Sequence, residues 1–89
     1  MALFSVSYDL NKAGQNYEAL YTELKRTEFK HIMDSTWLIS TSESAKDIYN
    51  RLSAKIDNND LIFISKVNSA QYFGSLRGDG IWQWISDRV

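Results

Sequence analysis

The sequence predicts an α+β domain whose elements follow the order β-α-β-β-α-β. Three observations support this. Polar and apolar residues alternate in the first segment, as in a strand, and apolar residues then recur with helical spacing. Two further strand-like segments, a second helical stripe and a fourth strand-like segment follow in that order. A chain of 89 residues has room for one domain. We expect its core over residues 2–67 and a short C-terminal extension over residues 68–89.

The first segment, residues 2–8, has the period of a strand with one apolar face. That face consists of Phe4, Val6 and Tyr8. Asp9 shares the parity of the intervening serines, so a strand that continues this far points Asp9 away from the apolar face.

A polar, loop-like stretch over residues 11–16 comes next, and Asn16 at its end is a candidate N-cap for a helix. Apolar side chains then recur with helical spacing, at Tyr17, Leu20, Tyr21 and Leu24. This stripe predicts an amphipathic helix that ends near Thr27.

Two short segments rich in aromatic and β-branched residues follow, over residues 29–33 and 36–41. They predict a pair of strands around Asp34 and Ser35, with one long bent strand as the alternative.

The second helix is predicted from Ser44, which forms a capping-box pattern with Asp47, although Glu or Gln is the usual partner. Its apolar stripe consists of Ala45, Ile48, Tyr49, Leu52 and Ile56. After a turn at residues 57–60, residues 61–67 predict the fourth strand, apolar enough on both sides to sit inside the sheet. Residues 81–89 are compatible with a short helix.

This order is that of a ferredoxin-like fold, in which an antiparallel sheet of order 4-1-3-2 carries both helices on one face. The side chains expected to be buried there are Tyr17, Leu20, Leu24, Ile48, Leu52 and Ile56. The other face needs a cover: the C-terminal extension, a partner subunit, or both. The extension is rich in aromatic residues with no place in the core, which predicts a homodimer and these interface residues: Tyr72, Phe73, Trp82 and Trp84.

Composition excludes several kinds of site. The chain has no cysteine, which rules out disulfides and thiolate chemistry. Ten Lys and Arg against eleven Asp and Glu give a net charge of −1, which counts against tight nucleic-acid binding by the monomer. No segment approaches the roughly 18 apolar residues of a membrane span, and the N-terminus does not resemble a signal peptide. We therefore expect a cytoplasmic protein without a membrane partner.

Asp9 is the candidate catalytic and metal-binding residue. It follows the first strand, and its carboxylate suits Mg²⁺ or Mn²⁺, which take oxygen ligands. The alternative is that Asp9 hydrogen-bonds the turn that follows it. A single carboxylate is a weak site for a divalent ion, which favours this structural role for Asp9.

The densest basic cluster consists of Lys25, Arg26, Lys30 and His31, with Phe29 among them. The candidate nucleic-acid-binding residues in it are Lys25, Arg26 and Lys30. Cations beside an aromatic ring can follow a phosphate backbone and stack on a base. A solvated helix C-terminus explains the same cluster through the helix dipole. His31, the only histidine, is a candidate general base, with a half-buried structural imidazole as the favoured alternative.

Three motifs together resemble a known family: SYDLN at residues 7–11, DSTW at residues 34–37 and NDLIF at residues 59–63. Over residues 3–67 the chain resembles the second core CRISPR-associated protein, a small dimeric adaptor of spacer acquisition, and more closely the SinR-like proteins of bacteria and phages. The VapD toxin ribonucleases are a weaker likeness.

The resemblance implies a ferredoxin-like homodimer in which Asp9 binds a divalent metal near the dimer axis, and some members of the family are nucleases. The chain departs from the family in its acidic balance and in Gly14-Gln15-Asn16, where arginines commonly cluster. The favoured hypothesis is therefore a non-catalytic module that binds nucleic acid or a partner protein. The alternatives are a metal-dependent endonuclease of RNA or DNA, and a regulator or inhibitor of phage or host defence that acts by protein contact.

Overall fold

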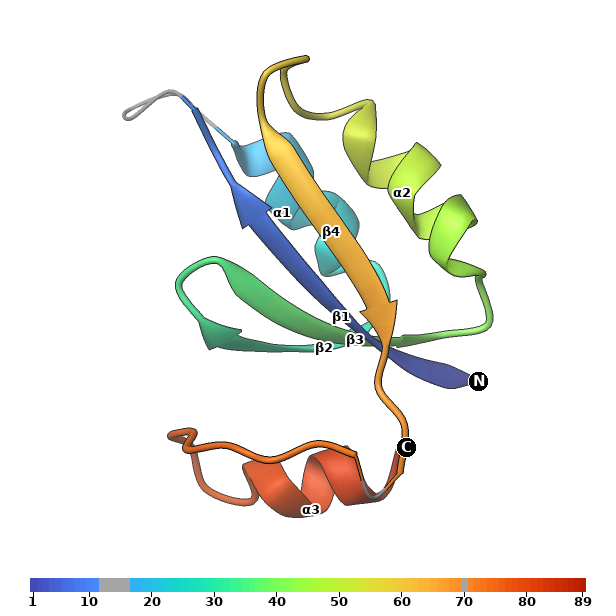
Figure 1. Ribbon diagram of the computed structural model, residues 1–89, viewed down its shortest axis with the longest axis vertical. Helices are drawn as coiled ribbons and strands as arrows, with labels where there is room; N and C mark the ends of the chain where they lie inside the picture. Colours follow the sequence, from blue (N-terminus) through green and yellow to red (C-terminus); the bar gives the residue numbers. More distant parts are fainter. Residues whose placement is uncertain (12–16, 70) are drawn as a thin grey trace.

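The computed structural model describes residues 1–11, 17–69 and 71–89. Its elements in chain order are β1 (Ala2–Asp9), α1 (Glu18–Leu24), β2 (Glu28–Met33), β3 (Thr36–Thr41), α2 (Ala45–Ser53), β4 (Leu61–Lys66) and α3 (Ile81–Ser86). The four strands form one antiparallel sheet of order β2-β3-β1-β4, which confirms the predicted α+β, ferredoxin-like fold (Figure 1). No helix in the described ranges is long and apolar enough to cross a membrane.

The main core lies between one face of the sheet and the helices α1 and α2. Alternate residues of β1 point into it because successive side chains of a strand point to opposite faces. The buried residues of this cluster are Phe4, Val6, Tyr8, Tyr17, Leu20, Leu24, Trp37, Ile39, Ile48 and Leu52. Five of the six helix residues predicted to be buried are therefore buried, and Ile56 is partly buried against the same cluster.

The loops at the end of the sheet where β1 finishes are held by the buried carboxylate of Asp60. It accepts hydrogen bonds from the Asn11 backbone N–H at 2.6 Å, the Tyr17 hydroxyl at 3.2 Å and the Asp57 backbone N–H at 2.8 Å. These bonds connect the second residue after β1, the start of α1 and the turn before β4. The hydrogen bond to Asn11 therefore holds the chain directly after Asp9.

The C-terminal ends of α1 and α2 differ from the prediction. α1 ends at Leu24, and the Thr27 hydroxyl donates to the Leu24 carbonyl at 3.1 Å, which closes the helix end before the predicted limit. α2 ends at Ser53, so Ile56 packs from the loop that follows. The predicted N-cap Asn16 lies outside the described residues.

The second face of the sheet is covered in part by the chain's own C-terminal extension. Leu3 and Leu38 pack against Ile81 and Ile85 in a separate buried cluster. Figure 1 shows α3 (red) apart from α1 and α2, beyond β2 and β3. An ion pair of 2.7 Å between Arg88 and the β2 residue Glu28 fastens the end of the chain to the sheet.

Candidate functional site

The part of the second face that α3 leaves open is a strip across β1 and β4. In the register of these strands Asp9 lies opposite Leu61, and Ser7 lies opposite Phe63. Leu61 is 63% exposed and Phe63 is 71% exposed, although both are large and apolar. A shallow hollow of about 270 Å³ lies along these residues. We call Leu61 and Phe63, with Ser7 and Asp9 beside them, the open strip.

Asp9 is exposed at the end of this strip. Across residues 1–11, 17–69 and 71–89 its carboxylate has no hydrogen-bond or ion-pair partner, and no group of three or more His, Cys, Asp or Glu side chains is placed to hold a metal ion. Mg²⁺ needs six oxygen ligands in a near-octahedral arrangement, several of which can be water. The nearby Ser7 hydroxyl already pairs with Thr36 at 3.1 Å. A single chain thus offers Asp9 alone, and its described residues do not form a complete metal site.

The three predicted basic residues do not form one surface. Arg26 pairs with Glu23 at 3.1 Å, which offsets its charge. Lys30 lies opposite Leu38 in the sheet and therefore on the second face, where its ammonium sits 5.8 Å from the Trp84 ring centre. Lys25 stands after α1 on the helix side. Lys25 and Lys30 therefore lie on opposite sides of the sheet.

Four aromatic rings gather on the helix side of β2 and β3. His31 lies almost parallel to Trp37, with ring centres 4.1 Å apart and an angle of 12°. Tyr21 stacks near Trp37 at 6.1 Å, and Phe29 lies 5.4 Å from the same indole. We call Tyr21, Phe29, His31 and Trp37 the aromatic platform. His31 is exposed, not the half-buried imidazole that the sequence favoured.

Hydrogen bonds fix the orientation of this platform. The indole N–H of Trp37 donates to the Tyr8 hydroxyl at 2.9 Å, and that hydroxyl donates to the Asp34 carbonyl at 3.3 Å. His31 donates from Nε2 to the same carbonyl at 3.1 Å. Burial, the largest influence, raises the pKa of Tyr8, so the phenol keeps the proton that it donates. The ring planes are thereby set before any ligand arrives.

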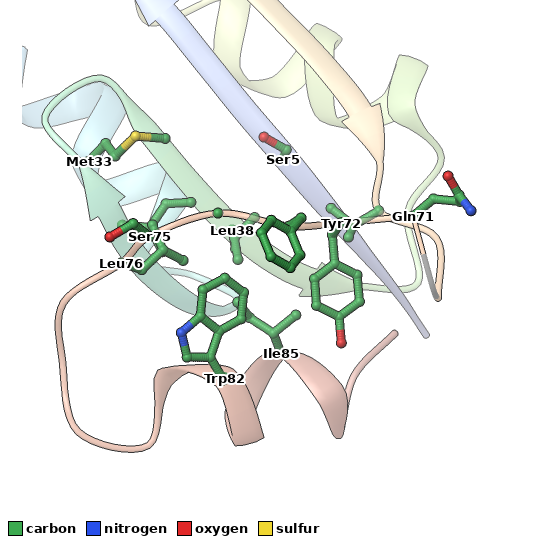
Figure 2. A pocket seen from close by; sticks show the side chains of 13 residues that line it. Ser5, Met33, Leu38, Gln71, Tyr72, Ser75, Leu76, Trp82 and Ile85 are labelled. Atoms are coloured by element: carbon green, nitrogen blue, oxygen red, sulfur yellow. The ribbon is translucent and has the colours of Figure 1, made fainter.

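Three of the four predicted interface residues, Tyr72, Phe73 and Trp82, line one pocket, and Trp84 packs separately against Lys30 and Arg88. Tyr72 stacks with Trp82 at 6.4 Å, Trp84 is half-buried beneath the Arg88 guanidinium at 4.2 Å, and Phe73 is fully exposed. A pocket of about 370 Å³ lies here. Figure 2 shows Tyr72, Trp82 and Ile85 of the C-terminal extension on one side of it and Ser5, Met33 and Leu38 of the sheet on the other. These aromatics are thus partly used to cover their own sheet.

Sequence reasoning missed Leu61 and Phe63 as candidate interface residues. The signal is present in residues 61–67, which are apolar on both faces, but this pattern also predicts a strand inside the sheet. In the described part of the chain, β4 is an edge strand that pairs with β1 alone, and the helices cover only the face that carries Ile62 and Ile64.

No protein-family model matches the chain. Among solved structures, it is similar to the crystal structure of a hypothetical protein, TT1823, from Thermus thermophilus. The two share 20% sequence identity with a TM-score of 0.63, over 85% of this chain and 94% of the other. This likeness agrees with the fold and carries no information about function.

Proposed function

We propose that this chain is a homodimeric, non-catalytic binding module of the CRISPR-adaptor-like or SinR-like type. The observation that carries the proposal is the open strip, where Leu61 and Phe63 stand exposed on a sheet face that α3 covers only in part. An antiparallel sheet face that meets water normally carries polar side chains. An apolar pair at this place fits a protein contact.

The occupant that we assign to the open strip is a second copy of the chain. A two-fold axis across the strip places the same residues against each other, as closed homodimers require. The net charge of −1 gives little repulsion between two copies. The fully exposed Phe73 and the 54% exposed Met33 add apolar surface on the same side of the sheet.

The assembly is tested by light scattering coupled to size-exclusion chromatography at micromolar concentration. We expect the wild-type protein at twice the chain mass of 10.3 kDa. The Phe63→Asp variant should have the mass of a monomer, because the substitution places an unpaired charge in the proposed interface. Tyr49→Asp is the matched control: Tyr49 is a 48% exposed aromatic on α2, and its variant should stay dimeric. A monomeric mass for the wild-type protein at every micromolar concentration measured would contradict the proposal.

A divalent-metal-dependent endonuclease is the second candidate function. The observation that favours it is the exposed, unpartnered Asp9 carboxylate at the end of the open strip, among the described residues. A dimer across this strip brings two such carboxylates toward its axis. Because one chain provides only one of them, this candidate depends on the dimer.

The nuclease hypothesis is tested by incubating the dimer with labelled single- and double-stranded RNA and DNA. Weak cleavage that needs Mg²⁺ or Mn²⁺ and is lost in Asp9→Asn would support it, since the amide keeps the shape but removes the charge that attracts the ion. No cleavage by a folded dimer would exclude it. Cleavage that survives both chelator and Asp9→Asn would place the chemistry elsewhere, with His31 as the next residue to test.

A further inference from the structure

We propose that the aromatic platform, with Lys25 at its rim, binds an unpaired base of single-stranded nucleic acid together with an adjacent phosphate. This inference rests on the proposed binding-module function and names its ligand. The platform lies on the helix side of the sheet, opposite the open strip, so that a dimer formed through the strip leaves it accessible.

The shape of the site suits a planar ligand. A hollow of about 340 Å³ is lined by the four platform residues and Lys25. Trp37 is 2% exposed and covers one face of the His31 ring, which is itself exposed, so the outer face of the imidazole is a flat aromatic surface open to solvent. Phe29, 36% exposed, stands beside it. Stacking on such rings is how proteins hold unpaired bases without reading their sequence.

The platform is ordered before binding. His31 is held between the Trp37 ring and the Asp34 carbonyl, and Trp37 is fixed in turn by its bond to the Tyr8 hydroxyl. A side chain that is already in place loses little conformational entropy when a ligand stacks on it. This network distinguishes His31 from an aromatic side chain such as Phe73, which projects fully into solvent.

Charge selects an anionic ligand. Lys25 has no ion-pair partner among the described residues, whereas its neighbour Arg26 is paired with Glu23. Among the residues that the structure describes, no carboxylate side chain lines the hollow. An aromatic surface with one available cation at its rim matches a base and its phosphate. The single cation also predicts a shallow salt dependence, with log K falling by about 0.7 per unit of log salt for one phosphate contact on a single strand.

The direct test is nuclear magnetic resonance of the 89-residue chain with oligothymidylate or oligouridylate of about eight nucleotides. His31 is the only histidine, so its imidazole protons report on the site alone. We expect these protons to shift upfield on binding, because a base stacked on the ring shields them. Loss of stacking in His31→Ala should weaken binding about tenfold, while His31→Phe, which restores a flat ring, should keep it.

The charge is tested by measuring affinity against salt for Lys25→Gln and for Lys46→Gln, an exposed lysine on α2 outside the hollow. Lys25→Gln should make the slope of log K against log salt shallower by about 0.7, the value for one phosphate contact on a single strand. Lys46→Gln should leave this slope unchanged. Unshifted His31 protons, equal effects of the two lysine variants, or unaltered binding by His31→Ala would each overturn the proposal. Light scattering on the same samples tests the dimer separately, so that failure of one proposal is distinguishable from failure of the other.

Discussion

Arg51 connects three segments through one guanidinium group. It donates to the Glu43 carboxylate before α2 at 2.8 Å and to the Glu23 backbone carbonyl of α1 at 2.6 Å, and it also bonds the Glu23 side chain at 3.3 Å. The Arg51 side chain is 17% exposed and that of Glu43 is 27% exposed, so solvent screens this pair less than an open surface pair. It therefore holds α1 to α2 at the end away from Asp60.

These contacts lower the pKa of both the Glu43 and the Glu23 carboxyl groups. The hydrogen bond from Arg51 is the main reason that the pKa of Glu43 lies below its ordinary 4.5. For Glu23, burial alone would raise the pKa, but the bonds and charges of Arg51 and Arg26 together lower it. A lowered folded-state pKa means that the carboxylate form stabilises the native protein.

The first prediction concerns Glu43→Gln and pH. The variant should lose about 1 kcal/mol of unfolding free energy at pH 7, because an amide keeps a weaker bond to Arg51. The Glu43 contribution is complete above about pH 4.5 and is lost as pH falls through the lower folded-state pKa. Urea unfolding of the two proteins from pH 7 to pH 2.5 should show their stabilities converging below pH 4.5.

Asp79→Asn, a change at an exposed carboxylate in the loop before α3, is the control and should remain close to wild type throughout. A difference between Glu43→Gln and wild type that stays constant down to acid pH would show that the Arg51 contact carries no pH-linked stability.

At the scale of the element, α2 depends on its first turn. Its nine residues are too few for a helix that is stable in isolation. The Ser44 hydroxyl accepts from the Asp47 backbone N–H at 3.1 Å, and the Asp47 carboxylate accepts from the Ser44 backbone N–H at 3.3 Å. The capping box that the sequence predicted is thus confirmed, with Asp in the place where Glu or Gln is usual.

The second prediction follows from this cap. Ser44→Ala removes the oxygen that accepts from the Asp47 N–H and should lower the free energy of unfolding by about 1 kcal/mol. Ser42→Ala, two residues earlier and exposed, is the matched control and should change it by less than about 0.5 kcal/mol. Equal stability of the two variants in urea would mean that tertiary packing alone holds the start of α2.

At the scale of the whole molecule, the sheet is packed on both faces by the same chain. The larger cluster lies under α1 and α2, and the smaller one joins Leu3 and Leu38 to Ile81 and Ile85 of α3. α3 has only six residues, so its stability comes from this contact and from the Arg88 to Glu28 ion pair.

The third prediction tests this docking. Ile85 is 3% exposed, and Ile85→Ala should destabilise the protein by about 2–4 kcal/mol through lost burial and the cavity that remains. Gln83→Ala, on the exposed side of the same helix, is the matched control and should cost under about 0.5 kcal/mol. Calorimetry or urea unfolding measures both. An undiminished stability in Ile85→Ala would contradict the packing of α3 on the sheet.

The sequence by itself determined the order of the elements, the sheet order and the main core. These follow from local periodicity: Phe4, Val6 and Tyr8 alternate because one face of β1 is buried, and Leu20 and Leu24 recur one turn apart because one side of α1 is buried. The two β-α-β units then admit few chain paths. Helix ends were less determined, since Thr27 closes α1 by a side-chain bond that periodicity does not encode.

Only the tertiary structure decided which of the candidate residues share a surface. Lys25 and Lys30 are five apart in sequence, yet they lie on opposite sides of the sheet. Lys25 follows α1 on the helix side, whereas its position in β2, opposite Leu38, turns Lys30 to the second face. His31 and Trp37 come together because β2 pairs with β3 in that register. The exposure of Phe63 depends on where α3 stops over the second face, which is set by long-range packing and not by the local spacing of residues.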